Sequence, residues 1–447
     1  MTGAEGLFCH AIPTNQRDYF RRLKYLDDAA SYTGTALNTE GCGPLLPGER
    51  GTAKPLRQQI FEYVRANGQA ARSDMTRALD ISPGSATTLT AEMISSGLLR
   101  EVAGLAREQG RGRPPVALEV VPDQTYVIGI KLSHKSHSAV VTDFAGNMIA
   151  DASVDTVHTR RSLSQLMDEI AELIDKVLIQ SGKSPADIKA VGIGLPGIVD
   201  HQSGVVPWSS LLSERDQDLA AAFAARFEMP VYLDNDANML TLAELWFGAG
   251  RVMTDFAVVT VEHGVGMGLV LNNRLYRGAR GMGLELGHSK VQLDGALCKC
   301  GQRGCLEAYL ADYALTREAG TALDQTYGGD QNESDVLETL FQQAKLGNTS
   351  AQMIFRRAGR YLALGLSNIV QLFDPGLIIL SGERMKYDYL YADEMLTEMQ
   401  SLTLSQGRAP CEIAIHAWGD LVWARGATAL ALSSLTDQMF SKSDLAL

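Results

Sequence analysis

The chain has 447 residues, enough for two or three domains, and its 45% hydrophobic and 21% charged residues are typical of a globular protein. It has no run of about 18 uncharged apolar residues and no basic start followed by an apolar core, so we expect a cytoplasmic protein without a membrane span or secretion signal. The net charge of −12 is uneven, since residues 54–116 carry +3, residues 1–53 carry −1 and the rest carries −14, so only residues 54–116 suit DNA.

Residues 1–53 show no sustained hydrophobic period and are rich in glycine and threonine. Such a segment buries too little apolar surface to offset the entropy that is lost on ordering it. We therefore predict a mostly disordered tail at the N-terminus, and a second, short tail at residues 436–447.

Residues 54–121 predict a DNA-binding domain that begins with three helices. Apolar residues recur at four-residue spacing over the first helix, at Leu56, Ile60 and Val64. We expect Ser73 to cap the second helix. Ser82 would cap the third helix, with Pro83 at its first position, where the missing N–H of proline is harmless.

Two strands, Leu98–Val102 and Val116–Val121, would follow the third helix and flank a polar loop. Helices followed by such a β-ribbon are typical of a winged helix-turn-helix, whose recognition helix presents its N-terminal residues to base edges in the major groove. The candidates for DNA contact on the third helix are Ser82, Pro83, Ser85, Thr87 and Thr88. None of them is a bidentate base reader such as arginine or asparagine, so we expect modest sequence readout.

A second set of DNA contacts is expected from Arg111 and Arg113, in the run Gly-Arg-Gly-Arg-Pro-Pro at residues 110–115. Arginine in a narrow A·T minor groove is favourable because the negative potential of that groove is enhanced. The alternative is a stiff basic linker that touches phosphates or nothing.

From about Tyr126 the pattern changes to strands that alternate with helices. The predicted strands are Tyr126–Leu132, Ala139–Asp143, Lys189–Gly194, Val231–Asp234, Phe256–Val261, Gly268–Leu271 and Leu377–Leu380. The predicted helices are Leu163–Gln180, Met239–Trp246 and Ala358–Phe373. This alternation predicts an α/β body of two lobes over residues 122–435.

The strongest local signal is His288 followed by Cys298, Cys300 and Cys305. In a reducing compartment, clustered cysteines indicate a metal more often than a disulfide. Three thiolates and one imidazole suit tetrahedral Zn2+, and four protein ligands make such a site structural rather than catalytic. We therefore predict a zinc loop over residues 288–305; the alternative is three free cysteines in a loop.

Three stretches of the sequence carry a family resemblance. The zinc loop with its flanking residues Gly287 and Glu307, the run Leu-Pro-Gly at 195–197 and the run Asp-Asn-Asp-Ala-Asn at 234–238 resemble signatures of the ROK family of repressors, uncharacterised reading frames and sugar kinases. The resemblance covers about residues 55–435, and the N-terminal domain looks like that of the family's transcriptional regulators. It implies a two-lobed, sugar-kinase-like body of the actin and hexokinase type.

The resemblance also implies a sugar site. Asp236 matches the carboxylate that, in the kinases, takes the proton from the attacked sugar hydroxyl, and Asn235 matches the amide beside it. Further sugar contacts would come from Gly197, Glu285, Glu307 and His288, whose two ring nitrogens would serve zinc and sugar. A sugar is a disc of hydroxyls, so a selective site needs several fixed carboxylates and amides. Without the resemblance, the alternatives are that Asp236 is a loop carboxylate or a helix cap, and that Glu307 is a cap neighbour or a solvated helix residue.

The nucleotide site departs from the kinase pattern. Family kinases have Asp-x-Gly-Gly-Thr on the first hairpin, whereas Lys-Leu-Ser-His-Lys stands here at 131–135. A lysine replaces the metal-side carboxylate, and Ser133 and His134 put side chains where phosphate needs bare backbone. Phosphoryl transfer depends on positioning and charge neutralisation, so this change should remove most of the rate. The alternative is that Lys131 and Lys135 are exposed hairpin charges without a role.

The sequence thus predicts a transcriptional regulator, a repressor of carbohydrate genes, that binds operator DNA as a homodimer or homotetramer and senses a sugar or sugar phosphate. The second hypothesis is an ATP-dependent hexose or N-acetylhexosamine kinase with an accessory DNA-binding domain, which Asp236 keeps open. A third is a sugar-dependent scaffold that binds another protein. One change in the sugar loop, Gly-Leu-Glu at 283–285 where the family has Ala-Gly-Glu, leaves the identity of the sugar open.

Overall fold

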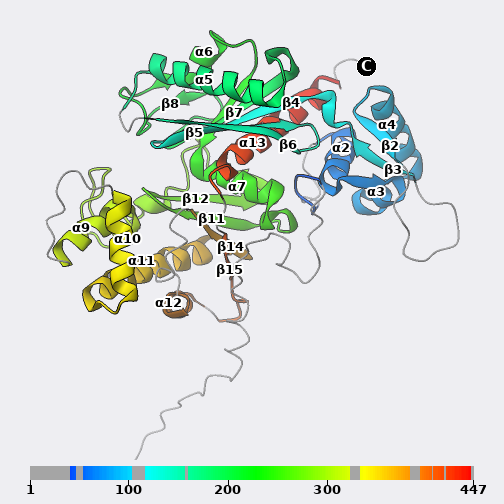
Figure 1. Cartoon of the computed structure of the whole chain (residues 1–447). Helices are drawn as coiled ribbons and strands as arrows, with labels where there is room; N and C mark the ends of the chain where they lie inside the picture. The colour runs from blue at the N-terminus through cyan, green and yellow to red at the C-terminus, as the bar shows by residue number, and fades with distance from the viewer. Residues whose placement is uncertain are drawn as a thin grey trace, which may run out of the picture.

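The structure is a computed structural model of the chain, and it describes residues 41–46, 54–102, 116–156, 160–322, 333–382, 393–404, 406–416 and 419–443 (Figure 1). A small module of helices and short strands near the N-terminus lies beside a larger α/β body that contains two sheets. Within the described ranges, no helix is both long and apolar enough to cross a bilayer.

The N-terminal module consists of three helices and a three-stranded antiparallel sheet. Its elements are α2 (Leu56–Asn67), β1 (Gln69–Ala71), α3 (Arg72–Leu79), α4 (Pro83–Ser95), β2 (Leu99–Val102) and β3 (Ala117–Val120). The strand order is β1-β3-β2, so β3 pairs with both of the other strands. The three predicted helices and two predicted strands are present, and β1 is an addition that the sequence did not predict.

The starts of α3 and α4 follow from their capping groups. Ser82 Oγ accepts a backbone N–H at 3.0 Å, and Pro83 occupies the first position of α4, as predicted. The predicted cap of α3 at Ser73 is wrong. The helix already begins at Arg72, so Ser73 lies inside it and Ala71 stands at the cap position. The Asp74 carboxylate instead accepts the backbone N–H of Ala71 at 3.3 Å, which satisfies a donor at the start of the helix.

The larger body contains two five-stranded sheets of the same topology. The first consists, in spatial order, of β10 (Val231–Asn235), β7 (Ile188–Leu195), β4 (Tyr126–Lys131), β5 (Ser136–Asp143) and β6 (Met148–Asp155). The second consists of β15 (Glu412–His416), β14 (Leu377–Ser381), β11 (Phe256–Val261), β12 (Val265–Leu271) and β13 (Arg274–Tyr276). In each sheet, three consecutive antiparallel strands are extended by two parallel strands, so each sheet forms one lobe. A short pair, β8 (Val205–Val206) and β9 (Gln217–Asp218), lies in the first lobe.

Helices connect these strands and join the lobes. Helices α5 (Leu163–Ser181) and α6 (Leu219–Ala224) belong to the first lobe. The second lobe has α8 (Glu307–Leu310), α9 (Asp312–Ala322), α10 (Glu333–Lys345), α11 (Thr349–Phe373) and α12 (Asp393–Leu402). Helices α7 (Asp236–Phe247) and α13 (Val422–Ser443) pack against each other between the lobes (Figure 1). Helix α7 follows the first sheet but contacts β11 and β12, whereas α13 follows the second sheet but contacts β4 and β7.

The contact of α13 with the first sheet requires glycine. A Cβ on Gly129 of β4 would lie 2.0 Å from the backbone oxygen of Ala424, and one on Gly192 of β7 would lie 2.0 Å from that of Ala427. Backbone oxygens of a helix cannot rotate away, so no other residue fits at either position without moving α13. The two glycines therefore allow α13, which follows the second sheet in the chain, to pack directly on the first sheet.

The predicted N-terminal tail is wrong at residues 41–46, the part of it that the structure describes. Cys42 is 1% exposed, belongs to a hydrophobic core cluster, and donates its N–H to Arg65 O of α2 at 3.0 Å. Gly43 N donates to Trp246 O of α7 at 2.9 Å. This segment is ordered because a small apolar thiol is buried and because its backbone groups form hydrogen bonds. Its composition alone had predicted a disordered tail.

The predicted C-terminal tail at 436–447 is also wrong over the whole of its described part, 436–443, because α13 continues to Ser443. Phe440 is buried and contacts Phe61 of α2, with ring centroids 5.5 Å apart. The end of the body is thereby packed against the N-terminal module. Residues 444–447 lie outside the described ranges.

Candidate functional site

The first group of predicted sugar-site residues lies at the carboxyl edge of the first sheet. Strands β4, β7 and β10 are parallel neighbours that end at Lys131, Leu195 and Asn235. Gly197 and Asp236 follow directly after two of these ends. Ligands of open α/β sheets bind at this edge, so the arrangement suits a binding site.

Asn235 and Asp236 begin helix α7. Asn235 Oδ1 accepts the N–H of Asn238 at 2.8 Å and thereby caps the helix, which leaves the amide NH2 group for a ligand. Asp236 is therefore not the cap, although its Oδ1 accepts the N–H of Ala237 at 2.9 Å. Burial raises the pKa of the Asp236 carboxyl, while that hydrogen bond and the charge of Lys131 oppose the shift.

The second group comes from the other lobe and meets the first. Glu285 precedes a single 3-10 turn, Leu286–His288. Glu285 is exposed, but packing on one side partly desolvates its carboxyl and raises its pKa; the charge of His288 lowers this pKa, and the carboxylates of Asp236 and Glu307 raise it. Because such electrostatic effects fall with distance, Asp236 of the first lobe lies near Glu285, Glu307 and His288 of the second.

Glu307 is held in place by several hydrogen bonds, one of them from Cys298 Sγ, which lies 3.5 Å from its Oε1. Its Oε2 accepts the N–H of Val265 at 3.3 Å, and its Oε1 accepts the Tyr313 hydroxyl at 3.3 Å. Glu307 is half-buried, so the alternative of a solvated helix residue is wrong. Tyr313 was missed by the sequence reasoning, since a single tyrosine on a helix gives no pattern signal.

Two loops around this space have constrained backbones. Gly197 has a φ of 129°, and a Cβ there would lie 2.3 Å from Trp208 O, so the neighbouring chain alone requires glycine. Leu284 has a positive φ of 70° at the position where the ROK pattern has glycine. A left-handed conformation of a residue other than glycine costs about 1–3 kcal/mol, and the packing of Leu284 against the core of the second lobe offsets this cost.

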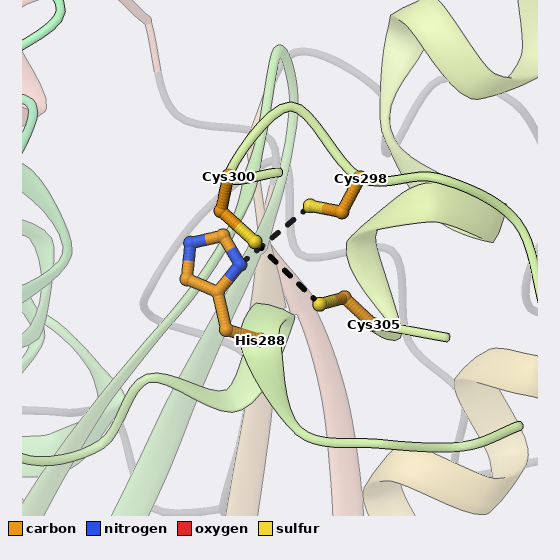
Figure 2. A group of neighbouring side chains, drawn as sticks. All are labelled: His288, Cys298, Cys300 and Cys305. Carbon is orange, nitrogen blue, oxygen red and sulfur yellow. Dashed lines mark hydrogen bonds between the residues drawn. The ribbon is translucent and has the colours of Figure 1, made fainter. Parts of the chain in front are cut away.

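Four side chains form a potential metal site on the second lobe (Figure 2). His288, Cys298, Cys300 and Cys305 each place one ligand atom within 4.8 Å of the other three. The Sγ atoms of Cys300 and Cys305 are 3.7 Å apart, as are Cys298 Sγ and His288 Nδ1. A tetrahedral site with metal–sulfur bonds of about 2.3 Å requires sulfurs about 3.8 Å apart, so the four residues could hold a four-coordinate metal.

Polar groups surround this cluster, while burial raises the pKa of the Cys298 thiol. Lys290 Nζ lies 2.9 Å from Cys305 Sγ, and its hydrogen bond with that sulfur raises the pKa of the lysine. The Tyr313 hydroxyl lies 3.5 Å from Cys298 Sγ. His288 turns Nδ1 toward the cysteines, so its Nε2 faces away from the cluster (Figure 2).

The turn between β4 and β5, where the resemblance places phosphate, is closed by its own side chains. Ser133 Oγ donates to a backbone carbonyl at 2.6 Å, and His134 Nε2 lies 2.8 Å from Ser210 Oγ. His137 Nδ1 accepts the N–H of Ser133 at 3.1 Å, and its Nε2 lies 2.9 Å from Glu169 Oε2. Burial lowers the pKa of His137, which favours the neutral ring that can accept at Nδ1. The backbone amide of Ser133 is thus already occupied.

The sequence left open that Lys131 and Lys135 are exposed charges without a role. The exposure is wrong, since both side chains are half-buried. Lys131 Nζ lies 3.9 Å from the centroid of the Trp423 ring, a cation–π contact. Trp423 is 4% exposed and lies in the first turn of α13. The lysine that replaces the kinase carboxylate is therefore an ordered cation beside Asp236.

The predicted DNA contacts on α4 lie on its outer face. Ser85 is half-buried and the others are exposed, namely Ser82, Pro83, Thr87 and Thr88. Ala86 and Met93 on the opposite face are fully buried. The Thr87 hydroxyl donates to a backbone carbonyl of its own helix, which leaves it mainly as an acceptor. Arg111 and Arg113 lie outside the described residues.

Helix α7 connects the sugar-site candidates with the N-terminal module. It begins at Asp236, and near its other end the Trp246 ring lies 4.6 Å from the Arg65 guanidinium of α2. Arg251, four residues beyond α7, is 4% exposed and donates to Gly43 O at 3.0 Å and to the Ala66 carbonyl of α2. One short helix thus spans the distance between the two regions.

A groove of about 1170 Å³ on the second lobe is separate from this site. It lies between α9, α11 and α12, and none of the sugar-site candidates lines it. Its arginines pair with nearby glutamates, in the pairs Arg356–Glu394, Arg357–Glu318 and Arg360–Glu398. The charges of these arginines are therefore compensated within the chain.

Two lobes of one topology, with carboxylates of both near each other, are typical of a sugar-kinase-like fold. Residues 127–434 match the ROK family, and the chain belongs to that family. The xylose repressor of Caldicellulosiruptor bescii is 27% identical over 341 residues, which cover 75% of this chain and 85% of that protein. The DNA-binding transcriptional dual regulator NagC of Escherichia coli K12 is 27% identical over 332 residues, which cover 74% of this chain and 80% of NagC.

Two solved structures show the same fold. A ROK family transcriptional regulator, described as a homologue of the E. coli MLC protein, superposes with a TM-score of 0.70 at 23% identity and covers 86% of this chain and 97% of its own. A ROK hexokinase from Thermus thermophilus has a TM-score of 0.61 at 28% identity and covers 70% of this chain and 100% of its own. The fold is therefore common to regulators and kinases, and the function has to be argued from the site.

Proposed function

We propose that this protein is a sugar-responsive, DNA-binding transcriptional regulator, a repressor of carbohydrate-metabolism genes, whose kinase-like body binds a sugar without phosphorylating it. The observation that carries this proposal is a contrast between two neighbouring groups of residues. Carboxylates suited to sugar hydroxyls are electrostatic neighbours of one another, whereas the turn assigned to phosphate is closed by its own hydrogen bonds. The relatives named as a repressor and a transcriptional regulator support it.

The DNA-binding part is a winged helix-turn-helix over residues 54–121, with α4 as the recognition helix. The exposed hydroxyls at the start of α4 and the charge of +3 over residues 54–116 support this role. Arg111 and Arg113 would add contacts in the minor groove. Because each half-site offers little base readout, the protein would act in the cytoplasm as a homodimer or homotetramer on paired half-sites.

The sugar site would use groups from both lobes. Asp236, Glu285 and Glu307 would accept hydrogen bonds from hydroxyls, and the Asn235 amide would donate to them. His288 Nε2 and the backbone near Gly197 would complete the contacts. A sugar bound by both lobes stabilises one arrangement of them, and α7 would carry the change from Asp236 to the module that it contacts at Trp246.

The Cys3His cluster would hold a structural Zn2+. Thiolate and imidazole donors at mutual distances of 3.7 Å suit this ion better than oxygen-preferring cations. Zinc would cross-link residues 288–305 and fix the ring of His288, whose other nitrogen then has a defined direction toward the sugar.

Replacing Cys300 with serine should remove the zinc, lower the melting temperature and weaken sugar affinity about tenfold through the loosened His288 ring. Atomic emission should find about one zinc per wild-type chain, and calorimetry gives the sugar affinity. Cys411→Ser is the control, since Cys411 is a buried cysteine outside the cluster, and this variant should keep its zinc. Sugar affinity equal to wild type in a zinc-free Cys300→Ser protein would contradict the role assigned to zinc.

Operator binding tests the proposed function. Labelled fragments of the DNA upstream of the gene are titrated with the protein at several salt concentrations, with and without a panel of common sugars and their phosphates. We expect specific binding that weakens steeply with salt and changes by a factor between about 5 and 150 with at least one sugar. Binding to no fragment under any of these conditions would refute the proposal.

A sugar kinase with an accessory DNA-binding domain is the second candidate, and Asp236 favours it. The carboxylate is present at the start of α7, where a general base would stand. The likeness to the Thermus thermophilus hexokinase extends over the body. Sugar-dependent ADP release that disappears in Asp236→Asn would establish this alternative.

A further inference from the structure

An ion pair links the two lobes next to the candidate sugar-site residues. Arg277 directly follows β13 of the second lobe, whereas Asp234 lies in β10 of the first sheet. Arg277 Nε donates to Asp234 Oδ2 at 2.6 Å. The two side chains are 22% and 3% exposed, so solvent screens this bond little. A charge-assisted hydrogen bond of this kind is stronger than an ion pair on the open surface.

Asp234 connects the ion pair to the start of α7. Its Oδ1 accepts the N–H of Asn235 at 2.9 Å and the side-chain amide of Asn238 at 2.7 Å. Asn238 is 5% exposed and lies in the first turn of α7. One carboxylate therefore holds the arginine of the second lobe together with residues on both sides of Asp236.

Arg277 is also the base of the loop that leads to Glu285. The N–H of Gly283 donates to Arg277 O at 3.1 Å, which closes this loop on itself. A Cβ on Gly281 would lie 3.8 Å from Val199 O, so the loop lies against the first lobe. The guanidinium thus fixes a loop of the second lobe on the edge of the first sheet, and the ion pair positions groups of both lobes.

The groups that the ion pair brings together repel each other when no sugar is bound. The carboxylates of Asp236 and Glu285 come from different lobes and raise each other's cost of ionisation. A sugar bound between the lobes would offset this repulsion only after it has bound. The bond between Arg277 and Asp234 crosses the same boundary, two residues before Asp236 in the sequence, and acts without sugar.

We propose that the Arg277–Asp234 ion pair is a latch that holds the lobes of the sugar-free protein together, and that Arg277 is a positioning residue of the sugar site. The inference rests on the function proposed above and adds the residue that sets how strongly sugar acts. Because the latch assembles the site in advance, sugar binds without first having to bring the lobes together. The latch also limits the effect of sugar on operator binding, since part of the rearrangement has already taken place.

Arg277→Gln tests the latch, and Arg274→Gln, which removes the same charge from an exposed position on β13, is the matched control. Calorimetry on the full-length protein uses D-xylose, D-glucose, N-acetyl-D-glucosamine and their phosphates. We expect Arg277→Gln to bind the effective sugar roughly tenfold more weakly, because fewer molecules have the assembled site. The control should stay within about twofold of wild type.

Operator binding separates a latch from a merely structural contact. At saturating sugar, Arg277→Gln should bind the operator within about twofold of wild type, since bound sugar restores the assembled arrangement. Without sugar, its operator affinity should lie further from that saturated value than the affinity of wild type does. The effect of sugar on operator binding therefore becomes larger in the variant.

A double substitution tests the bond itself. Asp234→Asn keeps an oxygen for Asn235 and Asn238 but loses the charge, so it should weaken sugar binding as Arg277→Gln does. Combining the two substitutions should cost less than about twofold further affinity, because either one alone breaks the ion pair. Losses that multiply would mean that the two residues act independently, and would overturn the inference.

Small-angle X-ray scattering of the sugar-free proteins tests the latch without DNA or sugar. The radius of gyration of Arg277→Gln should exceed that of wild type and of Arg274→Gln. Equal radii would overturn the inference and leave the proposed function standing. Weaker sugar binding with unchanged sugar-free operator affinity would also overturn it, by making Arg277 a direct sugar contact. If wild type binds no operator fragment with any sugar, the proposed function fails, while the scattering still decides whether the latch exists.

Discussion

Replacing Asp236 with asparagine should lower the affinity for the sugar effector roughly a hundredfold and leave the operator affinity of the unliganded protein unchanged. A carboxylate that accepts sugar hydroxyls contributes about 1.5–3 kcal/mol per hydrogen bond, and asparagine keeps the shape but loses the charge. Because burial raises the pKa of this carboxyl, removing the charge should not destabilise the fold. Calorimetry measures the first quantity, and anisotropy of labelled operator DNA measures the second.

The matched control for this substitution is Asp151→Asn, which removes a carboxylate from an exposed position on β6. It should leave both affinities within about twofold, since surface changes of this kind stay within about 0.5 kcal/mol. Wild-type sugar affinity in Asp236→Asn would exclude Asp236 from the sugar site. Loss of operator binding in the absence of sugar would instead assign it a structural role.

Replacing Arg251 with alanine should lower the free energy of unfolding of the N-terminal module by about 2–6 kcal/mol and abolish the effect of sugar on operator binding. The guanidinium donates to the carbonyls of Gly43 and Ala66, and each buried acceptor left without a donor costs about 1–3 kcal/mol. Urea unfolding should show a separate, earlier transition for the module, and sugar should still bind the body with wild-type affinity. This combination would show that the contacts at the end of α7 transmit the response.

Arg226→Ala serves as the control, because Arg226 is a surface arginine whose ion pair with Asp168 is largely solvated. It should shift stability by less than about 1 kcal/mol and preserve the response to sugar. A full response to sugar in a stably folded Arg251→Ala protein would rule out this route between the two regions.

Elements with a clear hydrophobic period were predictable. The strand Phe256–Val261 was placed correctly at both ends, and the helix predicted at Leu163–Gln180 ends one residue later, at Ser181. The helix buries one apolar face and the strand a continuous apolar run, so the hydrophobic pattern of the sequence matches the burial in the structure. Strand β6 (Met148–Asp155) was missed because only one of its residues, Ala152, is buried, which leaves no alternation to detect.

The candidate site was predictable where its residues lie close together in the sequence. The ligand set His288, Cys298, Cys300 and Cys305 follows from spacing alone, and the structure brings these four together. The contact of Lys131 with Trp423 joins residues at opposite ends of the body, and no local pattern announces such a pair. The same holds for Cys42, which is buried in a core cluster whose other members lie far away in the sequence. Both features depend on packing between residues far apart in the sequence, and such contacts cannot be predicted from the pattern of a single sequence.

The central claim is that the kinase-like body senses sugar without phosphorylating it. The most direct test measures the affinity for operator DNA at increasing effector concentration. ATP and magnesium are present, and ADP is followed in the same sample. We predict that operator affinity changes by at least about fivefold as the sugar site fills, and that no sugar-dependent ADP appears. Constant operator affinity at saturating sugar, together with ADP release that requires Asp236, would contradict this view of the protein.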